Sequence, residues 1–483
     1  MTSNWSGTYV VGSNTFADAL LIQNSGVLSS GGVCLGYGVS SSNNSVVVSD
    51  AGSAWNTGGL TIGDGGAGNS LVISNGGQVN GSGTMSSSDN TVLVSDLGSA
   101  WNNADELFIG GSAYNSLVIS NGGQVAGNSL CHIGEGIDSR NNSVVVSGSG
   151  SVLSNRNQFI VGNYGAGSRL VISSGGKVIS GGSYVGLTAN SNSVLVTDPG
   201  SIWSNGFLYV GSGSGHGNSL VVSNGGQVIS RSGYVFYGDT ALVTGSGSVW
   251  NSGFLSMPGF GSLTISNGGL MLDNEAFVGD GDTSSSNNTV CVTDGGAWQS
   301  GVLYVGNQGS SNSVVIGGGS VFATNLVVGF ASTLCNNLLE LDSGSVTVTN
   351  GGTGVLEVRH GKLILKGGTL QADTLVITNA CASFVHTGGT LIVGTVVLDP
   401  NTFRVVSVTP TVNDMLITWM MGPGATNALQ ATAGDGSGGY STNGFTDIFI
   451  VTNNTTVGTV TNYLDIGAAT NTPVRYYRAR LIP

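Results

Sequence analysis

Two groups of titratable side chains are the residues of this chain whose types could carry out chemistry. They are His132, Glu135, Asp138 and Arg140 in the first group, and Glu340, Asp342, Glu357, Arg359 and His360 in the second. Carboxylates beside imidazole or guanidinium groups can act as general acids and bases in glycan cleavage. Neither group recurs at a spacing that would stack two carboxylates. We therefore predict no catalytic residues and interpret both groups as solvated turn charges.

The sequence predicts no other chemical centre. Phosphate-binding loops, nucleophile elbows and zinc-ligand spacings are absent from it. Calcium would need more oxygen ligands than the single turn residue that each repeat supplies. We therefore expect no metal and no cofactor.

The five cysteines are odd in number and lie in different repeats: Cys34, Cys131, Cys291, Cys335 and Cys381. A disulfide framework or a metal site would need pairs or clusters at suitable spacing. We interpret the cysteines as small buried hydrophobic residues.

A row of aromatic residues is the stronger candidate for a functional site. Predicted strands that end in glycine, such as Leu107–Gly110, recur along the chain. Their flanking aliphatic residues must face the core, so the residue between them must face outward. The predicted outward row is Thr61, Phe108, His132, Ile160, Tyr184, Tyr209, Phe236, Ser256, Phe277, Tyr304 and Val327.

The aromatic members of this row are candidate ligand-binding residues: Phe108, Tyr184, Tyr209, Phe236, Phe277 and Tyr304. An exposed apolar stripe of this length would exceed the few hundred Å² usual on a monomer. One interpretation is a docking face for glycan rings or for another chain. The other is a cross-strand ladder that stacks on itself and needs no ligand.

A second aromatic row consists of tryptophans on alternate repeats: Trp55, Trp101, Trp203, Trp250 and Trp298. Tryptophan is mostly buried on average, so we predict packing in the core or at a corner. A platform for a polysaccharide is the alternative interpretation.

The elements that position these residues are internal repeats. The segment Val46–Trp55 recurs as 92–101, 194–203 and 241–250, and Leu71–Val79 recurs from Leu117, Leu170, Leu220 and Leu263. The apolar triplets recur about every 24 residues, which is the length of one coil of a parallel β-solenoid. Leucine-rich repeats and propeller blades do not fit, because a helical return segment and a period of about 40 residues are both missing.

We predict an all-β protein, with a single-stranded parallel β-helix over residues 1–399. About sixteen coils at about 4.8 Å each would make a rod about 75 Å long. Acidic residues alternate with Asn, Ser or Gly at the turn after each triplet, as in Asp50, Asn75 and Asp96. We interpret this row as turn formers spaced to avoid repulsion between stacked carboxylates.

The repeat stops near Leu398, and residues 400–483 are predicted to form a small antiparallel β-sandwich. Leu416–Trp419 and Ala428–Ala431 resemble the second and third strands of a fibronectin type III domain. Tyr476–Leu481 resembles its penultimate strand, in which a tyrosine usually makes a corner hydrogen bond. Nothing follows Pro483, so the last strand of that family is missing and an open edge is expected.

The 24-residue units resemble the passenger repeats of bacterial autotransporter-like surface proteins. Gly367–Leu370 and Gly388–Leu391 are similar to a related strand repeat of that family. The resemblance implies export, an extracellular or cell-surface location and often adhesion. It does not supply a secretion barrel.

Composition excludes further classes. The net charge of −13 and the lack of a Lys/Arg cluster argue against nucleic-acid binding. No apolar run is long enough for a membrane span, and no signal peptide begins the chain. The first coil starts abruptly, so we expect either a fragment of a longer secreted protein or a rod whose open end pairs with something else.

We therefore predict a secreted or cell-surface structural or adhesive rod without catalysis. Its expected partners are other copies of this chain, end to end or side by side, or surface glycans. The alternatives are a glycan-binding module that uses the outward aromatic row, and a polysaccharide lyase or hydrolase of the right-handed β-helix type.

Overall fold

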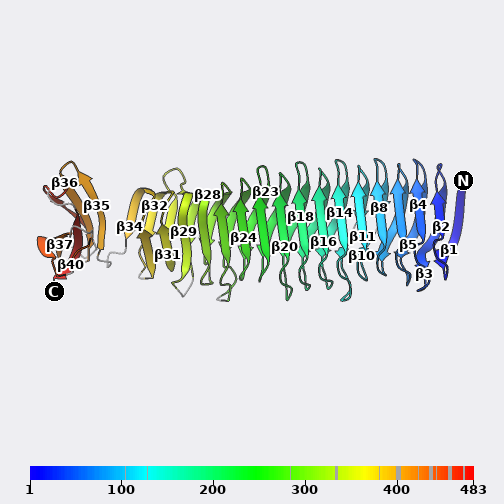
Figure 1. Ribbon diagram of the computed structural model, residues 1–483, viewed down its shortest axis with the longest axis horizontal. Coiled ribbons are helices and arrows are strands. Elements are labelled where there is room, and N and C mark those ends of the chain that lie inside the picture. The colour runs from blue at the N-terminus through cyan, green and yellow to red at the C-terminus, as the bar shows by residue number, and fades with distance from the viewer. Residues whose placement is uncertain are drawn as a thin grey trace.

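The chain forms a parallel β-solenoid of about sixteen turns, with about 24 residues per turn, followed by two small antiparallel sheets (Figure 1). The computed structural model describes residues 1–103, 105–127, 129–282, 284–331, 335–379, 381–398, 404–422, 424–434, 439–441, 443–454, 459–470 and 474–482. Within these residues there is no helix long and apolar enough to cross a membrane. The predicted all-β fold class is confirmed.

Each coil contributes one short strand and one long strand. The short strands are β2 (Ala19–Ile22), β4 (Ser45–Ser49), β6 (Ser70–Ser74), β8 (Thr91–Ser95), β11 (Ser116–Ser120), β14 (Ser143–Ser147), β16 (Arg169–Ser173), β18 (Ser193–Thr197), β20 (Ser219–Ser223), β22 (Thr240–Thr244), β24 (Ser262–Ser266), β26 (Thr289–Thr293), β31 (Gly361–Leu365) and β33 (Ala382–His386). Strands β28 (Ser313–Val328) and β29 (Asn337–Val348) begin at the position of a short strand and continue without a break into the position of the next long strand. We call the outward surface of β4 to β26 the short-strand face.

The long strands bend midway, so that their two halves lie on different sides of the coil. They are β1 (Thr2–Ser13), β3 (Val27–Tyr37), β5 (Ala54–Ile62), β7 (Gln78–Met85), β15 (Val152–Val161), β17 (Lys177–Val185), β19 (Ile202–Val210), β21 (Gln227–Val235), β23 (Val249–Met257), β25 (Leu270–Val278), β27 (Ala297–Val305), β32 (Thr369–Ile377) and β34 (Thr390–Leu398). In other coils the two halves are separate strands: β9 (Ala100–Asn102), β10 (Leu107–Ile109), β12 (Gln124–Gly127), β13 (Cys131–Ile133) and β30 (Val355–Val358).

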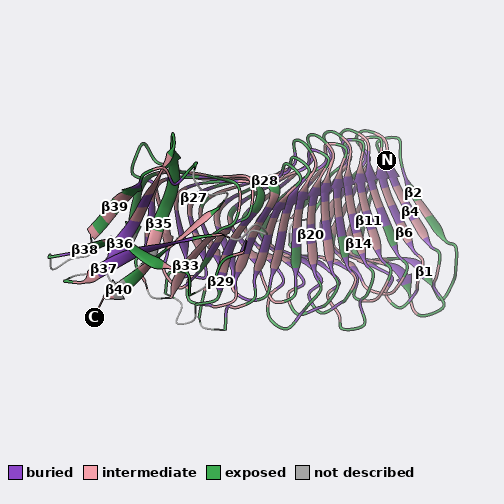
Figure 2. Ribbon diagram, turned by 60° about the vertical axis from the view of Figure 1, so that its left-hand side comes forward, coloured by how far each residue is buried: buried purple, intermediate pink, exposed green. Residues whose placement is uncertain are grey.

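Side chains alternate inward and outward along the short strands. In β4, Val46 and Val48 are fully buried, whereas Val47 between them is half-buried and faces outward. The same alternation in neighbouring coils aligns the buried positions along the rod (Figure 2). Two of the three apolar residues of each triplet therefore build the core, and the third builds the surface.

The five tryptophans of the repeats are fully buried, which confirms the prediction of core packing and excludes a polysaccharide platform. Four of the five indole N–H groups donate to the preceding coil, whereas Trp203 Nε1 has no partner among the described residues. Trp55 Nε1 donates to Ser30 Oγ at 3.3 Å, and Trp101 Nε1 donates to the carbonyl oxygen of Gly81 at 3.1 Å. A Cβ atom at Gly83 would lie 2.1 Å from the Trp101 ring, so glycine makes room for the indole.

A buried asparagine ladder runs beside the short strands and was not predicted. Asn44 Nδ2 donates to Asn69 Oδ1 at 3.0 Å, and Asn69 Nδ2 donates to Asn90 Oδ1 at 3.2 Å. The backbone N–H of Asn44 donates to the same Asn69 oxygen at 3.0 Å. The ladder consists of Asn44, Asn69, Asn90, Asn115, Asn142, Asn192, Asn218, Asn288, Asn312 and Asn337, all fully buried. Each side chain thus satisfies a backbone donor that burial would otherwise leave unpaired.

The turn that follows each short strand requires a left-handed backbone. Asp50 and Asn75 have φ values of 77° and 51° there, a conformation that Asn, Asp and Gly adopt with the least strain. Asp96 Oδ2 accepts the backbone N–H of Asn75 at 3.3 Å, while Asn75 Nδ2 donates to Ser49 Oγ at 3.2 Å. The turn-former interpretation is confirmed, and the alternation also pairs acceptors with donors.

The terminal part contains two three-stranded antiparallel sheets. One has the order β35 (Arg404–Thr411), β36 (Asp414–Met421), β39 (Thr459–Asp465), and the other has the order β38 (Thr446–Thr452), β37 (Thr426–Ala433), β40 (Arg475–Ile482). Its core consists of Ile417, Trp419, Met421 and Leu429. The Tyr477 hydroxyl donates to Asp465 Oδ2 at 3.0 Å, and burial, then this bond, raises the pKa of Tyr477 to about 12.

The cysteine prediction was wrong. Cys335 and Cys381 form a disulfide across 46 residues, and Cys34 and Cys291 are half-buried on outward positions, so only Cys131 is a buried hydrophobic residue. Between the two bonded coils, only Arg359 and His360 separate β30 from β31. Because this turn is short, Cys335 and Cys381 of the coils on either side of it lie with their Cα atoms 5.2 Å apart.

Candidate functional site

The outward row of the long strands is continuous in the structure, with one register correction. Tyr209 pairs with Tyr234, and Tyr234 pairs with Ser256, so Tyr234 occupies the position predicted for Phe236. Phe236 follows directly after β21 and lies with its ring 5.5 Å from that of Tyr209. Thr84, which the prediction omitted, stands between Thr61 and Phe108.

Nine rings form what we call the aromatic belt: Tyr184, Phe207, Tyr209, Tyr234, Phe236, Phe254, Phe277, Tyr304 and Phe330. The centroids of Tyr184 and Tyr209 are 5.0 Å apart, and those of Tyr209 and Tyr234 are 4.4 Å apart, with interplanar angles of 11° and 6°. Such ring distances follow directly from the spacing between parallel strands. The belt is therefore a stack whose geometry the solenoid imposes.

Ser256 interrupts the row, and a neighbouring phenylalanine fills the interval. Phe254 lies 6.0 Å from Tyr234 and 5.5 Å from Phe277, while Ser256 is only 2% exposed. Beyond this point, Phe277 and Tyr304 stack at 4.7 Å with an angle of 3°. The aromatic contact is thus maintained through the coil that lacks an aromatic residue in the row.

The stacked rings present their edges to solvent. Because Tyr184, Tyr209 and Tyr234 cover one another's faces, the surface consists mainly of ring edges and phenol groups. Burial, followed by the neighbouring Tyr234 and Tyr184, raises the pKa of Tyr209. At the end of the belt, the Arg359 guanidinium lies 4.7 Å from the centroid of the Phe330 ring. This arrangement favours self-stacking over flat binding of sugar rings.

Phe108 lies outside the belt, although it belongs to the same row. Its ring is 5.4 Å from that of His132, and Ile160, which is 1% exposed, separates His132 from Tyr184. The belt therefore includes five of the six predicted ligand-binding residues: Tyr184, Tyr209, Phe236, Phe277 and Tyr304.

The first titratable group brings together only two of its members. His132 Nδ1 bonds Glu135 Oε2, which also accepts Asn163 Nδ2 at 2.9 Å. Asp138 and Arg140 are exposed. Among the described residues, the His132–Glu135 pair makes no hydrogen bond to a second carboxylate.

The second titratable group divides between two sides of the coil. Glu340 and Asp342 contact Lys366 from the short-strand side. Glu357 lies in the long-strand row and pairs with Arg359 at 2.6 Å. His360 Nδ1 bonds the Gly329 carbonyl at 3.0 Å. Among the described residues, no group of three or more His, Cys, Asp and Glu side chains is arranged to hold a metal ion.

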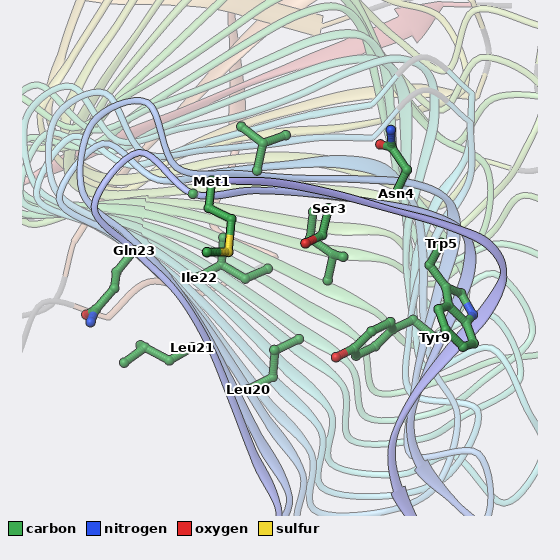
Figure 3. Close-up of a pocket in the computed structure, with 12 residues that line it drawn as sticks. Met1, Ser3, Asn4, Trp5, Tyr9, Leu20, Leu21, Ile22 and Gln23 are labelled. Atoms are coloured by element: carbon green, nitrogen blue, oxygen red, sulfur yellow. The ribbon is translucent and has the colours of Figure 1, made fainter.

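A cavity of about 540 Å³ lies at the N-terminal end of the solenoid (Figure 3). It lies between β1 and β2, with Tyr9, Leu20, Ile22 and Val27 among its lining residues. Trp5 stands at its margin, where Nε1 donates to the Thr8 carbonyl at 3.1 Å. Tyr9 and Leu20 of the lining pack against the hydrophobic core of the solenoid, and Tyr9 is the single titratable side chain in the lining, so the cavity suits apolar packing.

Comparison with known proteins adds no relative, because no protein-family model and no curated protein sequence matches this chain. The class of protein is therefore defined by its fold: an all-β protein with a parallel β-solenoid and a terminal antiparallel part.

Proposed function

We propose that this protein is a non-catalytic structural or adhesive rod of the cell exterior. The observation that carries the proposal is the unbroken register of outward residues over the stacked coils. The row from Tyr184 to Tyr304 runs through six consecutive long strands without a shift at the row position. A surface of this kind offers the same contact many times along one line, as repeat proteins with extended binding surfaces do.

The Cys335–Cys381 disulfide supports a location outside the cytosol. Disulfides persist in oxidising compartments and are rare where cellular reductants keep thiols reduced. The resemblance of the repeats to autotransporter-like passenger repeats also supports a location outside the cytosol.

The strand order of the terminal part supports its resemblance to a fibronectin type III domain. The first, second and fifth strands share one sheet, and the third strand lies beside the sixth in the other. This is the arrangement of immunoglobulin-like sandwiches without their last strand. Tyr477 bonds Asp465 at the end of the fifth strand, which is similar to a tyrosine corner.

A glycan-binding module is the second candidate, and the aromatic belt is the observation that favours it. Its ring edges and phenol groups would contact sugar hydroxyls along the rod. Polyanionic glycans are disfavoured, since the net charge of −13 repels them.

The full chain should therefore release no unsaturated oligosaccharides from polygalacturonate or alginate under any divalent-metal condition. Antibodies against it should label intact producing cells. Product release, or labelling only after permeabilisation, would contradict the proposal.

The glycan candidate is tested separately with Tyr209→Ser/Tyr304→Ser. We expect this variant to stay folded, at about 1 kcal/mol per lost cross-strand pair. Loss of glycan-array binding in the variant would establish the second candidate. An array on which the wild type binds nothing would remove it.

A further inference from the structure

The short-strand face is the most regular surface of the molecule. Each short strand from β4 to β26 presents three outward residues, which are a hydroxyl residue, a small or aliphatic residue and a second hydroxyl residue, as in Ser45, Val47 and Ser49, except that Arg169 takes the first position in β16. Pairing joins these positions coil by coil without a register shift. The middle column is Val47, Val72, Leu93, Val118, Val145, Val171, Leu195, Val221, Leu242, Thr264 and Cys291.

Several hydroxyl groups of the face bond to one another between coils. Ser143 Oγ donates to Ser116 Oγ at 3.1 Å, and on the other side Ser173 Oγ donates to Ser147 Oγ at 3.1 Å. Ser223 with Thr197 and Ser266 with Thr244 repeat the contact at 3.1 and 3.0 Å. A partner that covers the face leaves these paired hydroxyl groups satisfied.

The face is almost without charge, although the chain carries a net charge of −13. Arg169 is the single charged residue in its three columns. Two copies of an acidic protein repel each other least where such a surface meets its own copy. Beyond β26, the same side of the solenoid carries the ion pairs of Lys366 with Glu340 and Asp342, so the uncharged face ends at β26.

The geometry points to a second copy of this chain as the occupant, and we infer that two rods pair side by side through their short-strand faces. The inference rests on the proposed structural role and names its partner. An identical copy has an identical coil spacing, so its columns can pack against these columns over the whole length. Eleven coils at about 4.8 Å and five residues at about 3.3 Å make roughly 800 Å² per partner, the area of a standard stable interface.

The acidic turns determine the direction of the second rod. Asp50, Asp96, Asp198 and Asp294 follow the last hydroxyl column and line one edge of the face. A two-fold axis parallel to the rod places this edge opposite the other edge of the partner, whereas an axis along the strands would place acidic edge on acidic edge. The paired rods therefore run in the same direction, and each coil faces the same coil of its partner.

Sedimentation of the full chain tests the pairing. We expect a dimer, and Val145→Glu/Val171→Glu should weaken its dissociation constant at least about 30-fold. Both side chains face outward, so circular dichroism and thermal unfolding should stay near wild type. The matched control is Ile179→Glu/Ile229→Glu, because these residues are 47% and 42% exposed on the long strands. Ser147→Arg provides a second variant on the face if the first one fails to fold.

Cross-linking through Cys291 tests the direction of the second rod, because Cys291 lies in the middle column and would face Cys291 of the partner. Opposed sheets lie about 10 Å apart, so a short bis-maleimide should join the two thiols of a same-direction pair. Cys34→Ser is the background, and Cys291→Ser is the negative control. A monomeric wild type, or a dimer that only the control pair disrupts, would overturn the pairing, and a dimer without a Cys291 cross-link would overturn its direction. The cleavage and cell-labelling results of the proposed function do not depend on either outcome.

Discussion

The solenoid and the terminal sheets bury polar groups in different ways. In the solenoid, Asn69 and Asn90 are fully buried and bond to each other across coils. In the terminal sheets, Asn427 is also fully buried, but its side-chain nitrogen and oxygen have no partner among the described residues. The indole of Trp55 donates to Ser30 of the preceding coil, whereas Trp203 in the solenoid and Trp419 in the terminal sheets each have a buried Nε1 without a described partner. Repetition provides most members of the asparagine ladder with a similar group about one strand spacing away, and a core without repeats lacks this source of partners.

The largest effect is expected from a charge in the solenoid core. Ile109 is fully buried between Met85 and Ile133 of the neighbouring coils. Ile109→Asp should destabilise the solenoid by more than about 4 kcal/mol, because an unpaired carboxylate would be buried. Several coils should unfold together, since their stability is coupled to nearest neighbours.

Thermal unfolding followed by hydrogen exchange would measure this loss and its spread along the rod. The control is Thr84→Asp, on the outward row of the neighbouring coil, which should cost about 1 kcal/mol or less. Equal effects of the two variants would contradict the inward assignment of Ile109.

A core substitution in the terminal sheets should act locally. Trp419 is fully buried in a separate hydrophobic cluster from that of the solenoid. Trp419→Ala should cost about 3–5 kcal/mol of stability in that part alone. Calorimetry should show one transition lowered and the solenoid transition unchanged. A parallel fall of both transitions would mean that the two parts unfold as one unit.

Loss of the disulfide should have a smaller effect, at the end of the solenoid nearest the terminal sheets. Cys335 and Cys381 join coils on either side of the short Arg359–His360 turn. Cys335→Ser/Cys381→Ser should cost about 2–4 kcal/mol through greater freedom of the unfolded chain. Hydrogen exchange should increase in β31 and β33 and remain unchanged near β14. The control is Cys34→Ser, which removes a free thiol.

The smallest effect concerns an acidic residue in the asparagine ladder. Asp239 Oδ1 accepts the backbone N–H of Asn218 at 2.6 Å, while Asn218 Nδ2 and Asp239 Oδ2 have no partner within the described structure. Burial raises the pKa of Asp239 to about 6, and burial also raises that of Asp273 to about 6. Protonation of these groups therefore favours the folded state, and their contribution is lost as the pH rises from about 4 through about 6.

Asp239→Asn should raise the stability at pH 7 by about 1 kcal/mol and reduce the loss between pH 4 and 7. The part of this loss of stability that comes from Asp273 should remain in the variant. Denaturant titrations at several pH values would measure both effects, with Asp50→Asn on an exposed turn as the control. A variant that is less stable than wild type at pH 7 would show that the carboxylate is needed in the ladder.

Local patterns were sufficient to predict most of the fold. The 24-residue period, the glycine-ended strands and the alternation around Phe108 depend on residues close together in the chain. The segments compared with strands of a fibronectin type III domain also lie within observed strands: Leu416–Trp419 in β36, Ala428–Ala431 in β37 and Tyr476–Leu481 in β40. The asparagine ladder had a sequence signal as well, because Asn precedes Ser or Thr at the start of most triplets, as in Asn44-Ser45.

The sequence by itself thus determined the coil length, the strand positions and which residues alternate inward. Only the tertiary structure decided which residues meet between coils. Tyr234 and Phe236 have the same local alternation, and it is the pairing of β21 with β19 that places Tyr234 on Tyr209. The Cys335–Cys381 bond depends on the two-residue turn between them. The physical reason is that contacts between coils depend on the summed lengths of the turns, so a difference of one residue changes every partner.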